Sequence, residues 1–243
     1  MKHVTPIGYR LLATALICSL AQPAFAAGGA HAPKPPHGSG GNAADKGPAA
    51  APPTPAIDPV VAATAEMARV RSQAQALVRQ LADAAIDAIY SSPQQRARET
   101  VAPLASRLAM PVEVANEFDE IDFGEWTGSS FADLERENAA LWSQWVERRS
   151  TAQPPGGEAF AQVAQRALAG MGRLRDLHPD QTVLVLSHGD VIKAALACCL
   201  GMSLDNLERF DIAPASMSVL TTSGMDWKVR VVNQSLTGRV LPR

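Results

Sequence analysis

Runs of apolar residues alternate along the chain with amphipathic stretches in which apolar residues recur every three to four positions. The apolar runs predict short strands, and the amphipathic stretches predict helices. The predicted strands are Ala85–Tyr90, Pro111–Ala115, Val183–Leu186, Phe210–Ala213, Ser216–Thr221 and Trp227–Val232. The predicted helices are Val60–Ala84, Pro93–Leu108, Phe131–Arg148, Glu158–Leu177 and Val191–Leu200. This alternation favours an α/β fold of three layers, in which helices flank both faces of a mostly parallel sheet.

A histidine follows the most uniformly apolar of these strands. Val183–Leu186 contains only Val and Leu, and Ser187, His188 and Gly189 come directly after it. In open α/β sheets, ligands bind beyond the carboxyl ends of parallel strands. His188 is therefore a candidate functional residue, although a structural histidine that ends a strand is an equally ordinary interpretation.

The polar run after Ala85–Tyr90 predicts the start of a helix with a cation in its first turn. Ser92 is a suitable N-cap, Pro93 suits the first helical position, and Gln95 would complete a capping box. Arg96 would then lie beside free backbone N–H groups, where phosphate binds, and a guanidinium pairs with phosphate oxygens. Arg96 is a candidate phosphate ligand, with an ordinary solvated arginine as the alternative.

Residues 117–128, EFDEIDFGEWTG, are too acidic and too interrupted by glycine for a regular element, so we expect a loop. Carboxylates among aromatic side chains can have their pKa raised by desolvation, as a general acid near neutral pH requires. An acidic surface loop anchored by its aromatics fits the composition equally well. Residues 154–158, PPGGE, predict a turn before a helix start.

Taken in order and spacing, four motifs resemble those of the histidine phosphatase superfamily, which has the phosphoglycerate mutase-like fold. They are SSPQQRARET, EIDFGEWTG, PPGGEAF and VLVLSHGDVIKAAL. The resemblance implies hydrolysis of a phosphomonoester through a phosphohistidine intermediate. It makes Arg96 the phosphate-clamping arginine and His188 the second, non-nucleophilic histidine, with Gly189 also at the phosphate. It makes Glu120 the acid that protonates the leaving oxygen.

The family's nucleophile is a histidine in an Arg-His-Gly motif that ends a central strand, and no part of this chain matches that motif. His37 precedes a glycine, but its setting, KPPHGSGG, contains prolines that cannot donate the hydrogen bonds of a central strand. His178 indicates the end of a helix before a turn. A sheet without its central strand would leave buried backbone groups unpaired, at about 1–3 kcal/mol each.

Two explanations of this end of the chain compete. Either another segment, such as the apolar run Leu11–Leu20, fills the central place, or the sequence is altered by a frame change or misassigned start near Val70–Gln75. Residues 1–26 have the pattern of a secretory signal with an A-x-A site at its end, and residues 27–58, mostly Ala, Gly and Pro, predict a disordered linker. Residues 59–243 would then form a phosphatase-like domain that lacks its first catalytic strand. A genuine signal implies a periplasmic or secreted protein, and a misassigned N-terminus implies a cytoplasmic one.

Composition narrows the possible partners. A net charge of −2 without a basic stripe gives no indication of nucleic acid binding. No group of His, Cys and Asp has the spacing of metal ligands, and the resemblance implies no cofactor. The apolar run near the N-terminus is too short to span a membrane. The expected partner is a small phosphorylated substrate, and no feature indicates an oligomeric state.

Three functions fit these features. The first is a phosphomonoesterase of the histidine phosphatase family. The second is a pseudo-phosphatase that binds phosphorylated ligands through Arg96 and His188 but lacks a nucleophile. The third is an exported protein whose domain binds a partner. The family resemblance favours the first, whereas the missing nucleophile motif favours loss of activity in this chain.

Overall fold

The structure is a computed structural model, and it describes residues 12–18 and 59–236 of the 243-residue chain. The strands are β1 (Leu12–Cys18), β2 (Ala88–Ser91), β3 (Glu113–Val114), β4 (Thr182–Ser187), β5 (Ser216–Ser223) and β6 (Asp226–Ser235). The α-helices are α1 (Pro59–Leu81), α2 (Gln95–Leu108), α3 (Phe131–Glu137), α4 (Ala139–Glu147), α5 (Phe160–Leu177) and α6 (Gly189–Cys199). Short 3-10 helices are η1 (Asn116–Phe118), η2 (Gly124–Trp126) and η3 (Leu204–Arg209). None of the described helices is both long enough and apolar enough to cross a lipid bilayer.

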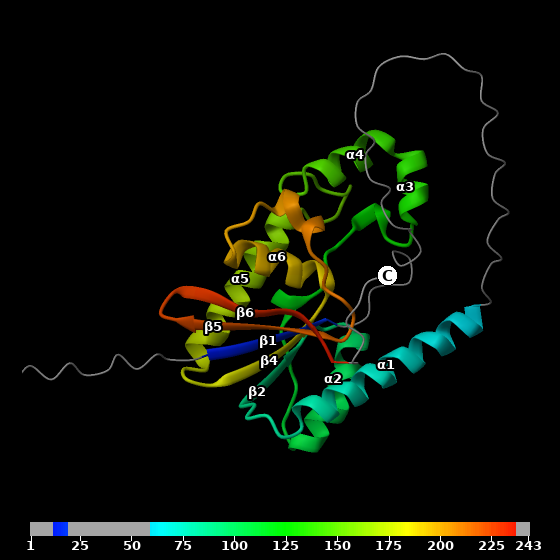
Figure 1. The fold of residues 1–243 in the computed structure, drawn as a ribbon. Helices are drawn as coiled ribbons and strands as arrows, with labels where there is room; N and C mark the ends of the chain where they lie inside the picture. The colour runs from blue at the N-terminus through cyan, green and yellow to red at the C-terminus, as the bar shows by residue number, and fades with distance from the viewer. Residues whose placement is uncertain (1–11, 19–58, 237–243) are drawn as a thin grey trace, which may run out of the picture.

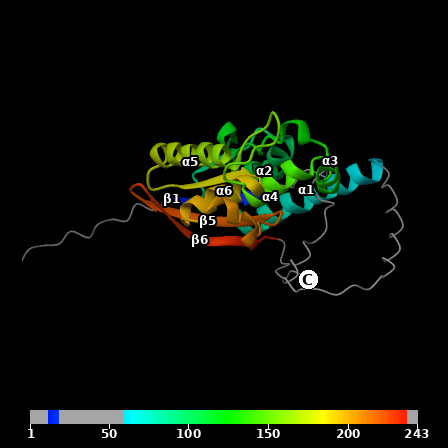
Figure 2. The same ribbon diagram turned by 90° about the horizontal axis from the view of Figure 1, so that it is seen from above.

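The strands form one mixed sheet in the order β3-β2-β4-β1-β5-β6. Strands β1 to β4 run parallel to their neighbours within that group, whereas β5 is antiparallel to both β1 and β6. Figure 1 shows α1 and α2 on one side of the sheet and α5 and α6 on the other, with β1 between β5 and β4, and Figure 2 shows β5 and β6 side by side.

Strand β4 contributes to a hydrophobic core on each face of the sheet. Val183 and Val185 pack in the core beneath α5 and α6, whereas Leu184 and Leu186 pack in the core beneath α1 and α2. A strand covered on both faces needs apolar residues at every position, which explains the unbroken apolar run. The predicted three-layer α/β fold with helices on both faces of a mostly parallel sheet is confirmed.

The segment Leu12–Cys18 occupies the middle of the sheet as β1. It pairs in parallel with β4, so that Cys18 lies opposite Ser187, and it pairs on its other side with β5. The arrangement is therefore the one in which part of the apolar run, Leu12–Cys18, fills the central place, so that the sheet is not formed by the strands after residue 59 alone. The cleavage site of the predicted signal, the linker 27–58 and His37 lie outside the described residues, so the signal and the domain boundaries stay predictions.

Two predicted elements were wrong. The single helix Phe131–Arg148 is two helices, because the backbone leaves the helical region at Asn138, with φ −132° and ψ 42°. Asparagine favours such breaks, since its side chain competes for backbone hydrogen bonds. The predicted strand Phe210–Ala213 is not part of the sheet, although the backbone at Phe210 is extended. Its Ala213 N–H donates to the side-chain Oδ1 of Asn233 at 2.7 Å instead of joining a ladder.

Candidate active site

The carboxyl ends of β2 and β4 bring the two main motifs together. The strands are adjacent and parallel, with Ser91 opposite Leu186. The residues that follow, Ser92 and His188, therefore meet at one edge of the sheet, and Ser92 N donates to the Leu186 carbonyl at 2.8 Å. Arg96 lies in the first turn of α2 above this edge, as the sequence predicts.

His188 is fully buried, and both of its ring nitrogens have partners. Nη2 of Arg96 donates to Nδ1 of His188 at 3.0 Å. Because a guanidinium cannot accept, Nδ1 is the acceptor and the neutral ring carries its proton on Nε2. Nε2 lies 2.7 Å from Ser92 Oγ, which itself donates to Oδ1 of Asp119 at 3.1 Å. The Asp119–Ser92 pair thus orients the ring so that Nδ1 faces Arg96.

The surroundings of His188 keep its imidazole uncharged. Burial, and then the positive charges of Arg96 and Arg166, lower the pKa of His188 to about 3. The ring is therefore neutral at physiological pH, and the fixed positive charge beside it belongs to Arg96.

Glu120 completes the cluster from the acidic loop, residues 117–128. Its Oε2 lies 3.5 Å from Nη2 of Arg96 and 3.4 Å from Nδ1 of His188. Burial, and then the negative charge of Asp190, raise the pKa of Glu120 to about 8, against the opposing effects of the Ile121 N–H and Arg96. Glu120 is therefore mostly protonated at neutral pH and can donate a proton, which is the property of a general acid.

The PPGGE turn, residues 154–158, is joined to this loop by backbone hydrogen bonds. Glu158 N donates to the Asp122 carbonyl at 2.7 Å, and Glu125 N donates to the Pro155 carbonyl at 2.9 Å. A Cβ added at Gly157 would overlap with the Asp122 carbonyl oxygen, so only glycine allows this approach. Two motifs that are 30 or so residues apart in sequence therefore form one structural unit.

The N-terminus of α2 differs from the predicted one. Ser92 was predicted to cap α2, but the N-cap is Gln94, and the Gln95 side chain bonds to Glu99 at 2.6 Å rather than completing a capping box. The Ser92 hydroxyl is instead engaged with His188. Gly189 is the first residue of α6, directly after His188.

His178 lies elsewhere. It caps the end of α5, as predicted, and bonds to Tyr90 Oη at 2.8 Å.

Sequence reasoning missed the partners of the site, Ser92 and Asp119, because their bonds depend on how β2 and β4 align. Among the described residues, no group of three or more His, Cys, Asp or Glu side chains could hold a metal ion.

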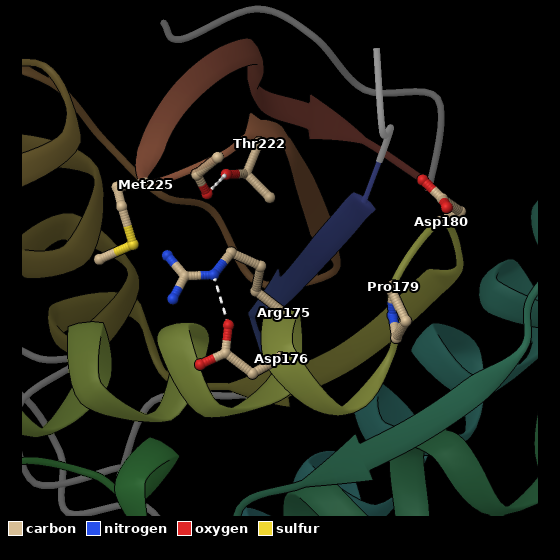
Figure 3. A pocket seen from close by; sticks show the side chains of 7 residues that line it. Arg175, Asp176, Pro179, Asp180, Thr222 and Met225 are labelled. Carbon is tan, nitrogen blue, oxygen red and sulfur yellow. Dashed lines mark hydrogen bonds and ion pairs between the residues drawn. The ribbon is translucent and has the colours of Figure 1, made fainter. Parts of the chain in front are cut away.

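A separate cavity of about 410 Å³ lies at the opposite edge of the sheet, where β4 begins (Figure 3). Arg175 and Asp176 of α5 line it together with Thr222 and Met225 of the β5–β6 hairpin. Arg175 Nε bonds to Oδ1 of Asp176 at 2.8 Å. None of the candidate catalytic residues lines this cavity, so the candidate site is the one at the carboxyl edge.

Comparison with known proteins agrees with the geometry. Adenosylcobalamin/alpha-ribazole phosphatase of Escherichia coli K12 is 29% identical over 171 residues, which cover 70% of this chain and 84% of that protein. The bifunctional protein Rv2228c of Mycobacterium tuberculosis is 37% identical over 152 residues, 62% of this chain. The match spans 41% of the length of that protein.

Solved structures of phosphoglycerate mutase-like phosphatases share the fold. The mycobacterial glucosyl-3-phosphoglycerate phosphatase Rv2419c in complex with inorganic phosphate superposes with a TM-score of 0.62 and 26% identity. The superposition covers 72% of this chain and 88% of that one. The sequence profile of the histidine phosphatase superfamily (branch 1) matches residues 68–235, from the second half of α1 to the end of β6. The chain therefore belongs to the histidine phosphatase superfamily.

Proposed function

We propose that this chain binds small phosphorylated compounds by their phosphate group and hydrolyses the phosphomonoester bond. The observation that carries the proposal is the cluster of Arg96, His188 and Glu120, whose polar atoms lie within 3.5 Å of one another. A guanidinium stabilises the charge on phosphate oxygens, and a protonated carboxyl supplies the proton that a leaving oxygen needs. The names of relatives that act on alpha-ribazole phosphate or glucosyl-3-phosphoglycerate support a small substrate.

To donate a hydrogen bond to a bound phosphate, His188 must carry a proton on Nδ1. The ring proton is on Nε2, and Nδ1 accepts from Arg96, so Nδ1 cannot donate to a phosphate oxygen in this state. A proton reaches Nδ1 when the phosphate charge favours the imidazolium. It also reaches Nδ1 when the Ser92 hydroxyl turns toward Nε2 and the ring changes tautomer. By either route, Nδ1 gains an N–H when phosphate binds.

A phosphate-binding protein without turnover is the second candidate function. The family's nucleophile is a histidine in Arg-His-Gly, and the 243-residue sequence contains no such tripeptide. His188 is the histidine that the described residues bring to this edge, and its full burial suits a fixed phosphate contact better than a mobile nucleophile. In this second function, Arg96 and His188 hold a phosphorylated ligand, and its ester bond stays intact.

Turnover by the full chain separates the two functions. We would measure orthophosphate release from a panel of small phosphomonoesters and, in parallel, binding of orthophosphate and vanadate. The variants are Arg96→Ala and His188→Ala, with Arg98→Ala as a control, because Arg98 is exposed on the same helix. Release that is lost in both site variants and kept in the control supports hydrolysis. Arg96-dependent binding without release supports the second function, and neither binding nor release contradicts both.

A further inference from the structure

Every N–H group of the Arg166 guanidinium, on α5, donates either to a backbone carbonyl of the acidic loop or to the Glu158 carboxylate. Nη1 donates to the backbone carbonyls of Glu117 at 2.9 Å and Asp119 at 2.7 Å. Nη2 donates to the carbonyl of Glu120 at 3.1 Å. Nε and Nη2 also bond to the two carboxylate oxygens of Glu158, each at 2.9 Å. A guanidinium has five N–H donors, and these contacts use all five.

Glu158 extends this connection along the loop. Its Oε2 accepts from the Asp122 N–H at 3.1 Å, while its own N–H donates to the Asp122 carbonyl. Arg166 and Glu158 therefore hold the loop backbone from Glu117 to Asp122, with the Glu120 carbonyl among the atoms that they fix. The side chains of Arg166 and Glu158 are 21% and 25% exposed, so water competes only in part with these bonds.

The position of Glu120 depends on this backbone. Its carboxyl group is buried against groups from three other segments: Arg96 from α2, His188 after β4, and Asp190 from α6. Asp119 is its charged neighbour on the loop itself. A loop that moved away would expose the carboxyl to water and separate it from Arg96 and His188.

We propose that Arg166 is a positioning residue, which fixes the loop backbone so that the Glu120 carboxyl stays buried beside Arg96 and His188. The inference deepens the proposed function and rests on it for the catalytic meaning of Glu120. Lysine cannot replace Arg166 in this role. Its ammonium group keeps the charge, but three donors on one atom cannot reach three carbonyls and a carboxylate in this planar arrangement.

The test is the pKa of Glu120 in the full chain, followed by NMR of ¹³C-labelled glutamate carboxyls, with Glu120→Gln identifying the signal. In the parent chain Glu120 should titrate near 8. In Arg166→Lys the pKa should fall toward the ordinary value of 4.5, because the released loop admits water. The retained positive charge at position 166 removes a simple loss of charge as the cause.

Arg173→Lys is the matched control. Arg173 lies on the same helix and contacts the same loop, but through the Glu117 side chain, which its Nε meets at 2.7 Å. This variant should leave the pKa of Glu120 unchanged. Glu158→Gln, which keeps the shape and an acceptor oxygen, should lower the pKa less than Arg166→Lys does, and it provides the answer if Arg166→Lys does not fold.

The outcomes separate this inference from the proposed function, because the titration needs no turnover. A folded Arg166→Lys or Glu158→Gln chain in which Glu120 keeps the parent pKa overturns the inference, whatever the chain binds. A parent chain that neither binds nor hydrolyses phosphate overturns the proposed function and leaves the titration to decide the role of Arg166. In an active chain, Arg166→Lys should lower kcat for esters with poor leaving groups and leave KM nearly unchanged.

Discussion

Replacing Arg96 by alanine should weaken orthophosphate binding by on the order of 100- to 1,000-fold. In the site, Nη2 of Arg96 already donates to Nδ1 of His188 at 3.0 Å and lies 3.5 Å from Oε2 of Glu120. Its Nε is buried and has no hydrogen-bond partner among the residues that the structure describes. A phosphate bound there can pair with the guanidinium through two charge-assisted hydrogen bonds, each contributing about 1.5–3 kcal/mol.

The two bonds together give about 3–6 kcal/mol, and each 1.4 kcal/mol is a factor of about ten in Kd. One effect offsets part of the loss. The charge of Arg96 helps to lower the pKa of His188, so its removal makes the ring easier to protonate and a better phosphate ligand. The expected loss therefore lies at the lower end of the range.

The assay is isothermal titration calorimetry of the full chain with orthophosphate, repeated with vanadate. Arg96→Lys should bind with intermediate affinity, because a lysine keeps the charge but not the paired geometry. Arg98→Ala, at an exposed position of α2, should bind like the parent. A loss of less than about threefold in Arg96→Ala, or an equal loss in Arg98→Ala, would refute the reasoning, since two charge-assisted bonds cannot be worth so little.

Four further predictions concern the acid, the loop and the central strand. Glu120→Gln should lower kcat by about 100-fold or more for esters with poor leaving groups but little for 4-nitrophenyl phosphate, and an equal loss for both would contradict a general-acid role. In the parent chain, kcat should fall as pH rises through the Glu120 pKa of about 8, because the protonated form is the active one. Gly157→Ala should lower Tm by several degrees, since the new Cβ overlaps with backbone, whereas Gly172→Ala, whose nearest neighbour would be 4.0 Å away, should not. Ala15→Pro should destabilise the fold by about 1–3 kcal/mol or more, because Ala15 lies in β1 between β4 and β5, and proline there removes a ladder N–H and leaves its carbonyl partner unpaired. A circular dichroism melt close to that of the parent would contradict the central position of β1.

The sequence predicts the layers of this fold because burial on both faces leaves a clear pattern. The centre of β4, Val183–Leu186, is uninterrupted Val and Leu, and the helices on either side repeat their apolar positions every three to four residues. The pattern also places His188 directly after one strand and Arg96 in the first turn of the helix that follows another, which is enough to bring them to one edge. Helix ends are less predictable, because Asn138 breaks a continuous amphipathic pattern through its own backbone conformation.

The identity of the central strand could not be predicted from the sequence alone. An apolar run such as LATALIC has the composition of a buried strand and also that of a signal peptide, and periodicity does not distinguish them. In the structure, Leu12–Cys18 pairs with β4 and β5 as the central strand. Removal of residues 1–26 by a signal peptidase would delete this strand, so the two interpretations exclude each other. The intact mass of the folded protein, with or without residues 1–26, distinguishes them.

The contacts that tune the site were also beyond sequence reasoning. Ser92 meets His188 across 96 positions, and Arg166 meets Glu120 across 46. Such contacts depend on the alignment of β2 with β4 and on the packing of α5, which local patterns do not encode. The pKa of Glu120 depends on the same packing, because burial is its largest cause.

The most direct test of the account is the protonation of His188 when phosphate binds, measured by ¹⁵N NMR of the labelled ring in the full chain. Without phosphate, Nε2 should carry the proton and Nδ1 should show the signal of an unprotonated nitrogen. At saturating orthophosphate, Nδ1 should gain a proton, and Arg96→Ala should suppress the change at the same phosphate concentration. A His188 ring that is unaffected by bound phosphate would contradict the account, because the phosphate would then lie elsewhere.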